Sequence, residues 1–305
     1  MIFNKDKNGA EELRSLTGNY YANNDFSKMK ADIETATDEL ARIIGRDTYL
    51  AAEREYLSGN PSDLVTLVQR PIALLATLSM YRKNDISHED SGRKVKTASD
   101  GTDRIPWEWQ LDRDDAIHLE EYYRAVERLI RYLDDNEVDT WMNSDQKKTA
   151  SALLIRSGRE FDKYFPIQSS ERMYMLLVGF IREAQIRHVK PAYGGQWDDL
   201  LSDKGIPETE VHFAACKAVA LLSMAIALRR LPLQLIPQGI IRSYMAENGA
   251  RASLPASLED VNKLSDWLVQ DATDWVAQMK DIRDDRVGDI SILPENDPRN
   301  KYFKL

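Results

Sequence analysis

Apolar residues recur three and four positions apart over most of the chain, and this spacing predicts amphipathic helices. In the first half, the expected helices run from residue 25 or 27 to 44, from 48 to 57, from 63 to about 80, and from 112 to 133. The third helix is apolar on several faces, so we expect it in the middle of its domain. Pro71 lies inside it and is expected to kink or break it. Gly45 and Ser62 are expected to cap neighbouring helix ends.

The second half shows the same alternation of apolar helical runs and turn signals. Its expected helices run from 144 to about 164, from 173 to 186, from 197 to 201, from 211 to 228, and from 258 to about 282. Pro166 stops the first of them. Residues 1–24 are rich in Asn and Gly, and we expect an arm rather than a core element there. The last residues are charged and rich in loop signals, which predicts a tail.

Two segments carry the pattern of a β-hairpin instead of a helix. Residues 91–98 alternate weakly, and Asp100-Gly101 then predicts a tight turn. Asn248-Gly249 is the matching signal in the second half. We therefore expect one hairpin near 91–106 and a second near 239–255.

The two halves match each other at offsets that drift between 144 and 149 residues. Helix-to-helix matches are weak support, because any two amphipathic helices align on their apolar stripes. Turn, proline and glycine matches arise less readily by chance, and they favour a tandem duplication. We expect a mostly α fold of two related helical modules joined by a linker helix. The expected divisions are an arm (1–24), module 1 (25–137), the linker helix (138–166), module 2 (167–284) and the tail (285–305).

Composition adds limits to this picture. A chain of 305 residues with 43% hydrophobic and 30% charged residues is long enough for two globular domains. The one cysteine, Cys216, excludes an internal disulfide and has the apolar neighbours of a small buried residue. The N-terminus lacks the apolar core of a signal peptide, and the longest apolar run, 219–228, is shorter than a membrane span, so we expect a soluble intracellular protein. A net charge of −9 argues against a general grip on nucleic acid.

No motif of known chemistry stands out. The four histidines lie in unrelated contexts; His118 and His212 are expected to be partly buried packing residues. His88-Glu89-Asp90 lacks the spacing of a helical zinc site and is expected to be a solvated loop. Carboxylates near residue 112 suit the start of a helix. We therefore expect no catalytic, cofactor-binding or metal-binding residues and no enzyme.

Trp107 and Trp109 precede the last helix of the first module. Such aromatics either staple the chain onto the core or anchor an interface, and we expect the core for at least one of them. A two-stranded ribbon on a helical body is marginal alone and is often stabilised by another chain's edge, which predicts oligomerisation. The predicted interface residues are Val95, Asp100, Gly101, Trp107, Trp109, Ile240, Tyr244, Asn248 and Gly249.

The order of elements, with the stretches IGRDTYLAAEREYLSG, LVQRPIALLATLSMYRK and GRKVKTASDGTDR, resembles the helical head–tail connector (neck adaptor) proteins of tailed bacteriophages. The stretches PWEWQ and FDKYFPI are similar to an uncharacterised family from prophages of gut bacteria. This resemblance implies a non-enzymatic virion protein that forms a homo-oligomeric ring below the portal and contacts the portal and other neck or tail proteins. Members usually carry one such helical module, whereas two are expected here.

The expected location is the virion neck, after synthesis in the host bacterial cytoplasm, with no membrane partner. DNA would pass through the ring without being specifically bound, which the acidic balance suits. The alternative is a cellular helical adaptor or ligand-binding protein with a pocket between the two halves. A metal-dependent helical enzyme is a third, more remote hypothesis.

Overall fold

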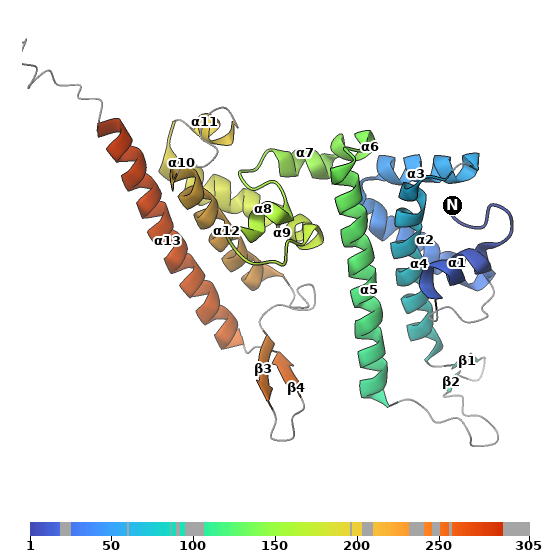
Figure 1. The fold of residues 1–305 in the computed structure, drawn as a ribbon. Coiled ribbons are helices and arrows are strands. Elements are labelled where there is room, and N and C mark those ends of the chain that lie inside the picture. The colour runs from blue at the N-terminus through green and yellow to red at the C-terminus, as the bar shows by residue number, and fades with distance from the viewer. Residues whose placement is uncertain are drawn as a thin grey trace, which may run out of the picture. The chain divides into compact units, whose positions relative to one another are not determined.

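The computed structural model shows a mostly α protein that divides into two compact units, Met1–Thr149 and Ala150–Leu305 (Figure 1). It describes residues 1–18, 26–59, 61–85, 87–89, 92–94, 107–195, 197–202, 210–231, 241–245, 251–255 and 258–288. For the four strands and for residues 285–288 only the backbone is described. The prediction of a mostly α fold is confirmed.

The first unit is built around one apolar helix, α4, which packs against α1, α2, α3 and α5. Its helices are α1 (Gly9–Thr17), α2 (Phe26–Ile44), α3 (Arg46–Ser58), α4 (Asp63–Asn84), α5 (Glu108–Asp135), α6 (Asp139–Met142) and α7 (Asp145–Ser151). The last two residues of α7 belong to the second unit. Buried residues cover several faces of α4, as its apolar sequence predicted. Pro71 does not break α4, which runs through it as one helix. Packing against four helices offsets the single backbone hydrogen bond that a proline removes.

The N-terminal segment belongs to the core of this unit. Ile2, Phe3 and Leu13 are buried. The Nε2 amide of Gln69 in α4 donates a hydrogen bond of 2.6 Å to the carbonyl oxygen of Ile2, and the terminal ammonium lies 2.5 Å from Glu53. The expectation of an arm is therefore wrong for residues 1–18, because a few apolar side chains among the polar ones suffice to dock the segment.

Gly45 and Gly59 stand at helix ends in this unit with positive φ angles, where a side chain would be strained. Gly45 has a φ of 84° between α2 and α3, as predicted. Gly59 has a φ of 84° and ends α3, its N–H donating to the carbonyl of Tyr56 at 3.3 Å. Ser62 does not cap α4 with its side chain. Its hydroxyl donates instead to the carboxylate of Glu55.

The second unit repeats the use of a central apolar helix. Its elements are α8 (Gly158–Asp162), α9 (Glu171–Ala184), the π-helical turn η2 (Gln185–Val189), α10 (Lys190–Tyr193), α11 (Trp197–Leu201), α12 (Glu210–Arg230) and α13 (Leu258–Gly288). Helix α12 packs along α13 and against α9. Cys216 is buried on α12, which confirms its prediction as a small core residue.

The linker helix expected at 138–166 is not present. The chain forms the short helices α6, α7 and α8, and the break at residues 152–157 carries Leu153, Leu154 and Ile155 into the core of the second unit. Ser157 caps α8 by accepting a hydrogen bond of 3.1 Å from the N–H of Glu160. The apolar side chains of this segment are buried without a continuous helix, so their spacing does not indicate a helical stripe.

Two short antiparallel strand pairs complete the fold. Strand β1 (Ser87–Glu89) pairs with β2 (Gly92–Lys94), and β3 (Ile241–Met245) pairs with β4 (Arg251–Pro255). The strand at 92–94 pairs with 87–89, a pairing that the sequence did not predict. Both predicted turns, Asp100-Gly101 and Asn248-Gly249, lie outside the described residues.

Helices α4 and α12 are long and apolar enough, by length and composition, to cross a membrane. Polar residues interrupt the apolar sequence of both helices, so neither forms one unbroken apolar run. Each is mostly buried against neighbouring helices of its own unit. The core helix of a globular unit has the same properties, so this feature alone does not mark a membrane span.

Candidate interaction surfaces

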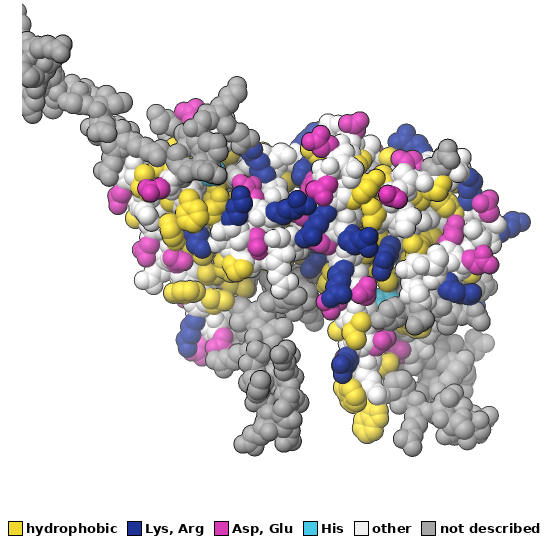
Figure 2. Space-filling view, in the orientation of Figure 1, with side chains coloured by type: hydrophobic (Ala, Val, Ile, Leu, Met, Phe, Trp, Pro, Cys, Tyr) yellow, Lys and Arg dark blue, Asp and Glu magenta, His cyan; other side chains and the backbone are white. Residues whose placement is uncertain are grey.

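Two tryptophans stand at the start of α5 with their side chains in solvent. Trp107 is 70% exposed and Trp109 is 58% exposed. Figure 2 shows hydrophobic surface at the lower end of α5, where this helix begins. The side chain of Gln110 caps the start of the helix. Its Oε1 accepts a hydrogen bond of 2.9 Å from the backbone N–H of Trp107. The expectation that at least one tryptophan is buried is therefore wrong.

Acidic side chains surround this pair. Glu108, Asp112 and Asp114 are exposed on the first turns of α5, with Arg113 among them. Negative charge is favoured there by the helix dipole, as the sequence predicted. We call Trp107, Glu108, Trp109 and Asp112 the tryptophan end of α5.

The rest of α5 is held firmly in the first unit. Its stripe of Tyr122, Val126, Leu129, Ile130 and Leu133 is buried, as predicted. His118 is also buried, and burial lowers the pKa of its imidazole, with opposing effects from Leu74, Asp114 and Asp115. A rigid helix that presents two aromatic side chains is well suited to anchor a partner, because little conformational entropy is lost on binding.

Most of the other predicted interface residues cannot be placed. Val95, Asp100, Gly101, Ile240, Asn248 and Gly249 lie outside the described residues. Tyr244 lies in β3, opposite Ala252 in β4. Of the predicted residues, the described structure therefore brings together Trp107 and Trp109.

A second exposed surface lies on the π-helical turn that follows α9. Ile186 is 51% exposed there, and Arg182 and Lys190 are exposed four residues before and after it. Residues four apart lie on one helix face, so the apolar side chain is flanked by two cations. We call Arg182, Ile186 and Lys190 the basic stripe.

The π-helical turn has a tertiary cause. Gln185 is buried, and its side-chain Oε1 accepts a hydrogen bond of 2.9 Å from the backbone N–H of Leu154. This bond gives a partner to one backbone N–H of the irregular segment that precedes α8. Single π-turns are rare and are often found at functional sites. The basic stripe is not among the predicted interface residues, although the i, i+4 spacing of its Arg, Ile and Lys is present in the sequence.

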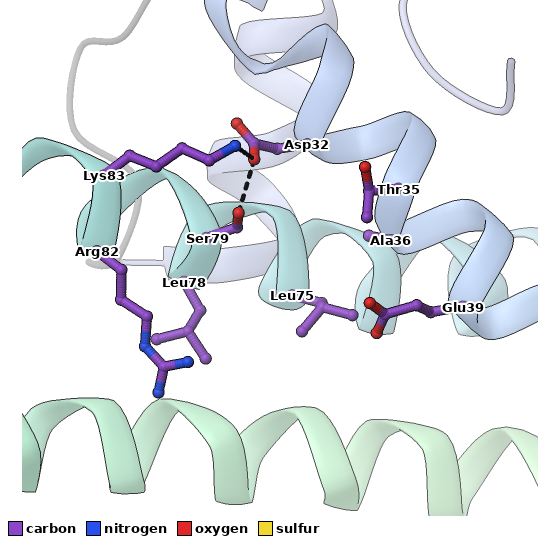
Figure 3. Close-up of a pocket in the computed structure, with 9 residues that line it drawn as sticks. All are labelled: Asp32, Thr35, Ala36, Glu39, Leu75, Leu78, Ser79, Arg82 and Lys83. Atoms are coloured by element: carbon purple, nitrogen blue, oxygen red, sulfur yellow. Dashed lines mark hydrogen bonds and ion pairs between the residues drawn. The ribbon is translucent and has the colours of Figure 1, made fainter.

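A groove of about 360 Å³ lies between α2 and α4 in the first unit (Figure 3). Asp32 on its wall is buried and accepts hydrogen bonds from the hydroxyl of Ser79, at 2.6 Å, and from the ammonium of Lys83. Arg82, which also lines it, points to α5 and pairs with Asp115 at 2.6 Å. These charges are already compensated by bonds that join three helices, so the groove is best explained as a structural feature.

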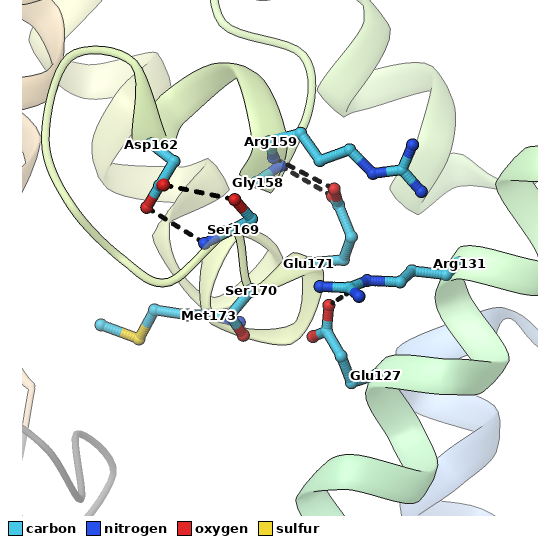
Figure 4. A network of polar contacts seen from close by, with 9 residues as sticks. All are labelled: Glu127, Arg131, Gly158, Arg159, Asp162, Ser169, Ser170, Glu171 and Met173. Carbon is cyan, nitrogen blue, oxygen red and sulfur yellow. Dashed lines mark hydrogen bonds and ion pairs between the residues drawn. The ribbon is translucent and has the colours of Figure 1, made fainter.

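The polar network around α8 and α9 also has a structural explanation (Figure 4). Glu171 is buried and accepts hydrogen bonds from the N–H groups of Gly158, at 2.7 Å, and Arg159, at 3.2 Å. Asp162 accepts bonds from the N–H groups of Ile167, at 2.7 Å, and Ser169, at 3.0 Å. These backbone bonds hold the pKa of Asp162 below its usual value. The hydrogen bonds to both carboxylates thus stabilise the conformation of the loop between α8 and α9 and of the start of α8.

The contact between Cys216 and a histidine has the composition of a nucleophilic pair but not its chemistry. The Sγ atom lies 3.7 Å from the nearest ring nitrogen of His212. Burial raises the pKa of the Cys216 thiol to about 12. Because the thiolate is the reactive form, this cysteine is a poor nucleophile near neutral pH. Among the described residues, no group of three or more His, Cys, Asp or Glu side chains could hold a metal ion.

Comparison with known proteins finds a family match for one stretch of the chain. Residues 34–151 match the model of a family described as "Family of unknown function (DUF6712)". No curated protein and no solved structure matches the chain. The matched stretch begins within α2 and ends at the last residue of α7, so it includes the tryptophan end and most of the groove.

Proposed function

We propose that this protein is a non-enzymatic structural subunit of a tailed phage, a head–tail connector that assembles into a ring between portal and tail. The observation that carries the proposal is the exposure of both Trp107 and Trp109 at the start of α5, a helix whose later turns are buried in the first unit. Tryptophan is among the residues most enriched in interface hot spots. Its large side chain is costly to leave in water and stabilises a complex when a partner covers it.

The order of elements supports a second part of the proposal, two related modules. In the first unit α2, the short α3 and the buried α4 precede a strand pair and the long α5. In the second unit α9, the short α10 and α11, and the buried α12 precede a strand pair and the long α13. Each central apolar helix packs against the helix before the short elements and against the long last helix. A duplicated module with a β-hairpin accounts for this parallel.

The strand pairs support assembly because, among the residues that the structure describes, each pair consists of two strands. Every strand of a two-stranded sheet has an open edge of backbone N–H and C=O groups. Such an edge can accept a strand from another chain. We propose that the hairpins contact neighbouring subunits, and that portal and tail proteins are the other partners.

The charge of the chain suits a neck through which DNA passes. A net charge of −9 disfavours a lasting grip on phosphates, so DNA would slide through the ring without specific binding. The proposed site of action is the virion neck, with synthesis in the bacterial cytoplasm and no membrane partner.

Reconstitution tests this proposal. The purified full chain is mixed with portal rings of a phage that encodes it, and the products are separated by size and imaged in negative stain. We expect a ring of the chain stacked on the portal, and W107S/W109S should reduce its occupancy. The matched control is W267S, because Trp267 is 62% exposed on α13. A chain that stays monomeric and never joins a portal ring contradicts the proposal.

A further inference from the structure

We propose that the tryptophan end of α5 binds the basic stripe of a second copy of the same chain. This inference rests on the proposed function, since it names the contact by which ring subunits would join. The two surfaces lie in different units, Trp107 and Trp109 in the first and Ile186 in the second. Each copy therefore offers both halves of the contact, and such a head-to-tail interface propagates from one copy to the next.

Charge complementarity between the two surfaces supports the pairing. The tryptophan end carries exposed Glu108 and Asp112 one helical turn apart. The basic stripe carries exposed Arg182 and Lys190, roughly 6 Å along the helix on either side of Ile186. Opposite charges at the rim of an apolar contact steer association and fix its orientation.

The apolar parts also match in kind. Two indoles that are 70% and 58% exposed meet an isoleucine that is 51% exposed. The aliphatic stems of Arg182 and Lys190 extend the apolar area, because such stems pack along apolar surface while the charge stays in water. Arginine also stacks on aromatic faces, which adds a contact that a neutral partner could not make.

Other acidic surfaces of the chain fit the stripe less well. On α13, Trp267 has the acidic neighbours Asp266 and Asp271, but Asp266 is already paired with Arg229. In the tryptophan end, no ion pair of Glu108 or Asp112 with another described residue occurs within 4 Å. The tryptophan end, with two tryptophans and two carboxylates that form no ion pair with a described residue, is therefore the better match for the basic stripe.

Complementation between two variants tests the contact. W107S/W109S removes the tryptophan end and keeps the stripe, whereas I186D/K190E removes the stripe and keeps the tryptophans. We expect the wild-type chain to form assemblies larger than a dimer in analytical ultracentrifugation. Each variant should stay monomeric, with self-association weakened at least about tenfold. A one-to-one mixture of the two should form a heterodimer that does not grow, because only one intact contact can form.

Matched controls separate this result from general effects of surface substitution. L57D introduces the same charge as Ile186→Asp at another side chain that is 51% exposed, and W267S removes an exposed indole from α13. Both controls should assemble like the wild type, and circular dichroism should show native helix content for every variant.

Three outcomes overturn the inference. The pairing is excluded if either double variant keeps wild-type assembly. It is also excluded if the mixture fails to dimerise. In both cases, binding of the wild-type chain to portal rings would still support the proposed function. A wild-type chain that is monomeric excludes a second copy as the partner. Binding of that monomer to portal rings then decides the proposed function separately.

Discussion

The Nε2–H of His118 in α5 donates a hydrogen bond of 2.7 Å to the carbonyl oxygen of Leu74 in α4. The two residues are 44 positions apart, so the bond ties the long helix to the centre of the first unit. His118 is 1% exposed. Its burial disfavours the charged imidazolium and lowers the pKa of the ring, although Asp114 and Asp115 act in the opposite direction.

This buried histidine predicts that the first unit loses stability in mild acid. In the unfolded chain the imidazole takes up its proton near pH 6.5, whereas the folded unit resists protonation to a lower pH. The stabilising contribution is therefore complete above pH 6.5 and declines below it, by up to about 1.4 kcal/mol per pH unit. Urea unfolding at pH 7.0, 6.0 and 5.5 measures the decline. H118L should flatten it and H188A, on an exposed histidine, should not; equal slopes for H118L and wild type would contradict the assignment.

A pair of glycines predicts opposite responses to the same substitution. A Cβ atom on Gly158 would lie 2.4 Å from the carbonyl oxygen of Ser170, whereas one on Gly179 would meet nothing within 4 Å. G158A should cost about 1–3 kcal/mol, because backbone must move. G179A should stabilise by up to about 1 kcal/mol, since alanine favours the helix. Thermal unfolding of the two variants measures both signs, and a neutral G158A would mean that the loop at 163–170 adapts freely.

The spacing of apolar residues predicted two kinds of helix well: those with one apolar face and those that are apolar all round. The stripe of α5 and the all-apolar α4 follow directly from residue spacing, because burial imposes that spacing. The break between α7 and α8 does not follow, since Leu154, Phe161 and Phe165 have the spacing of a helical stripe. What breaks it is long-range, including the bond from Leu154 to Gln185 and the close approach of Gly158 to Ser170.

The surfaces were less predictable than the core. Trp107 and Trp109 could be singled out from the sequence, but their exposure could not, because a tryptophan before a helix packs inward or outward with equal ease. The side chain of Gln110 caps the start of α5, and this hydrogen bond involves neither indole. The basic stripe depends on a π-helical turn that a contact between distant residues stabilises, so its i, i+4 spacing alone does not predict it.

Asp32 predicts a large effect from one buried carboxylate. It accepts bonds from Ser79 and Lys83 of α4 and thereby joins α2 to α4. D32A should cost about 1–3 kcal/mol, because the hydroxyl of Ser79 loses its partner at a partly buried position. Chemical denaturation measures the loss, with D38A as the control on an exposed carboxylate of the same helix. If D38A and D32A cost the same, the polar contacts of Asp32 do not stabilise the pair of helices.

Cys216 predicts a thiol that reacts only when the second unit opens. Its side chain is buried among the alanines of α12, and burial raises its pKa to about 12, so the thiolate fraction at pH 8 is very small. We expect a thiol reagent to label the native protein at pH 8 at least about a hundredfold more slowly than the urea-unfolded protein, since attack requires both access and the thiolate. Rates that rise with urea below the unfolding midpoint would reveal local opening around α12, which α9 and α13 normally cover. Rapid labelling of the fully folded protein would instead mean that His212 activates the thiol, and the cysteine would then have to be reconsidered as a reactive site.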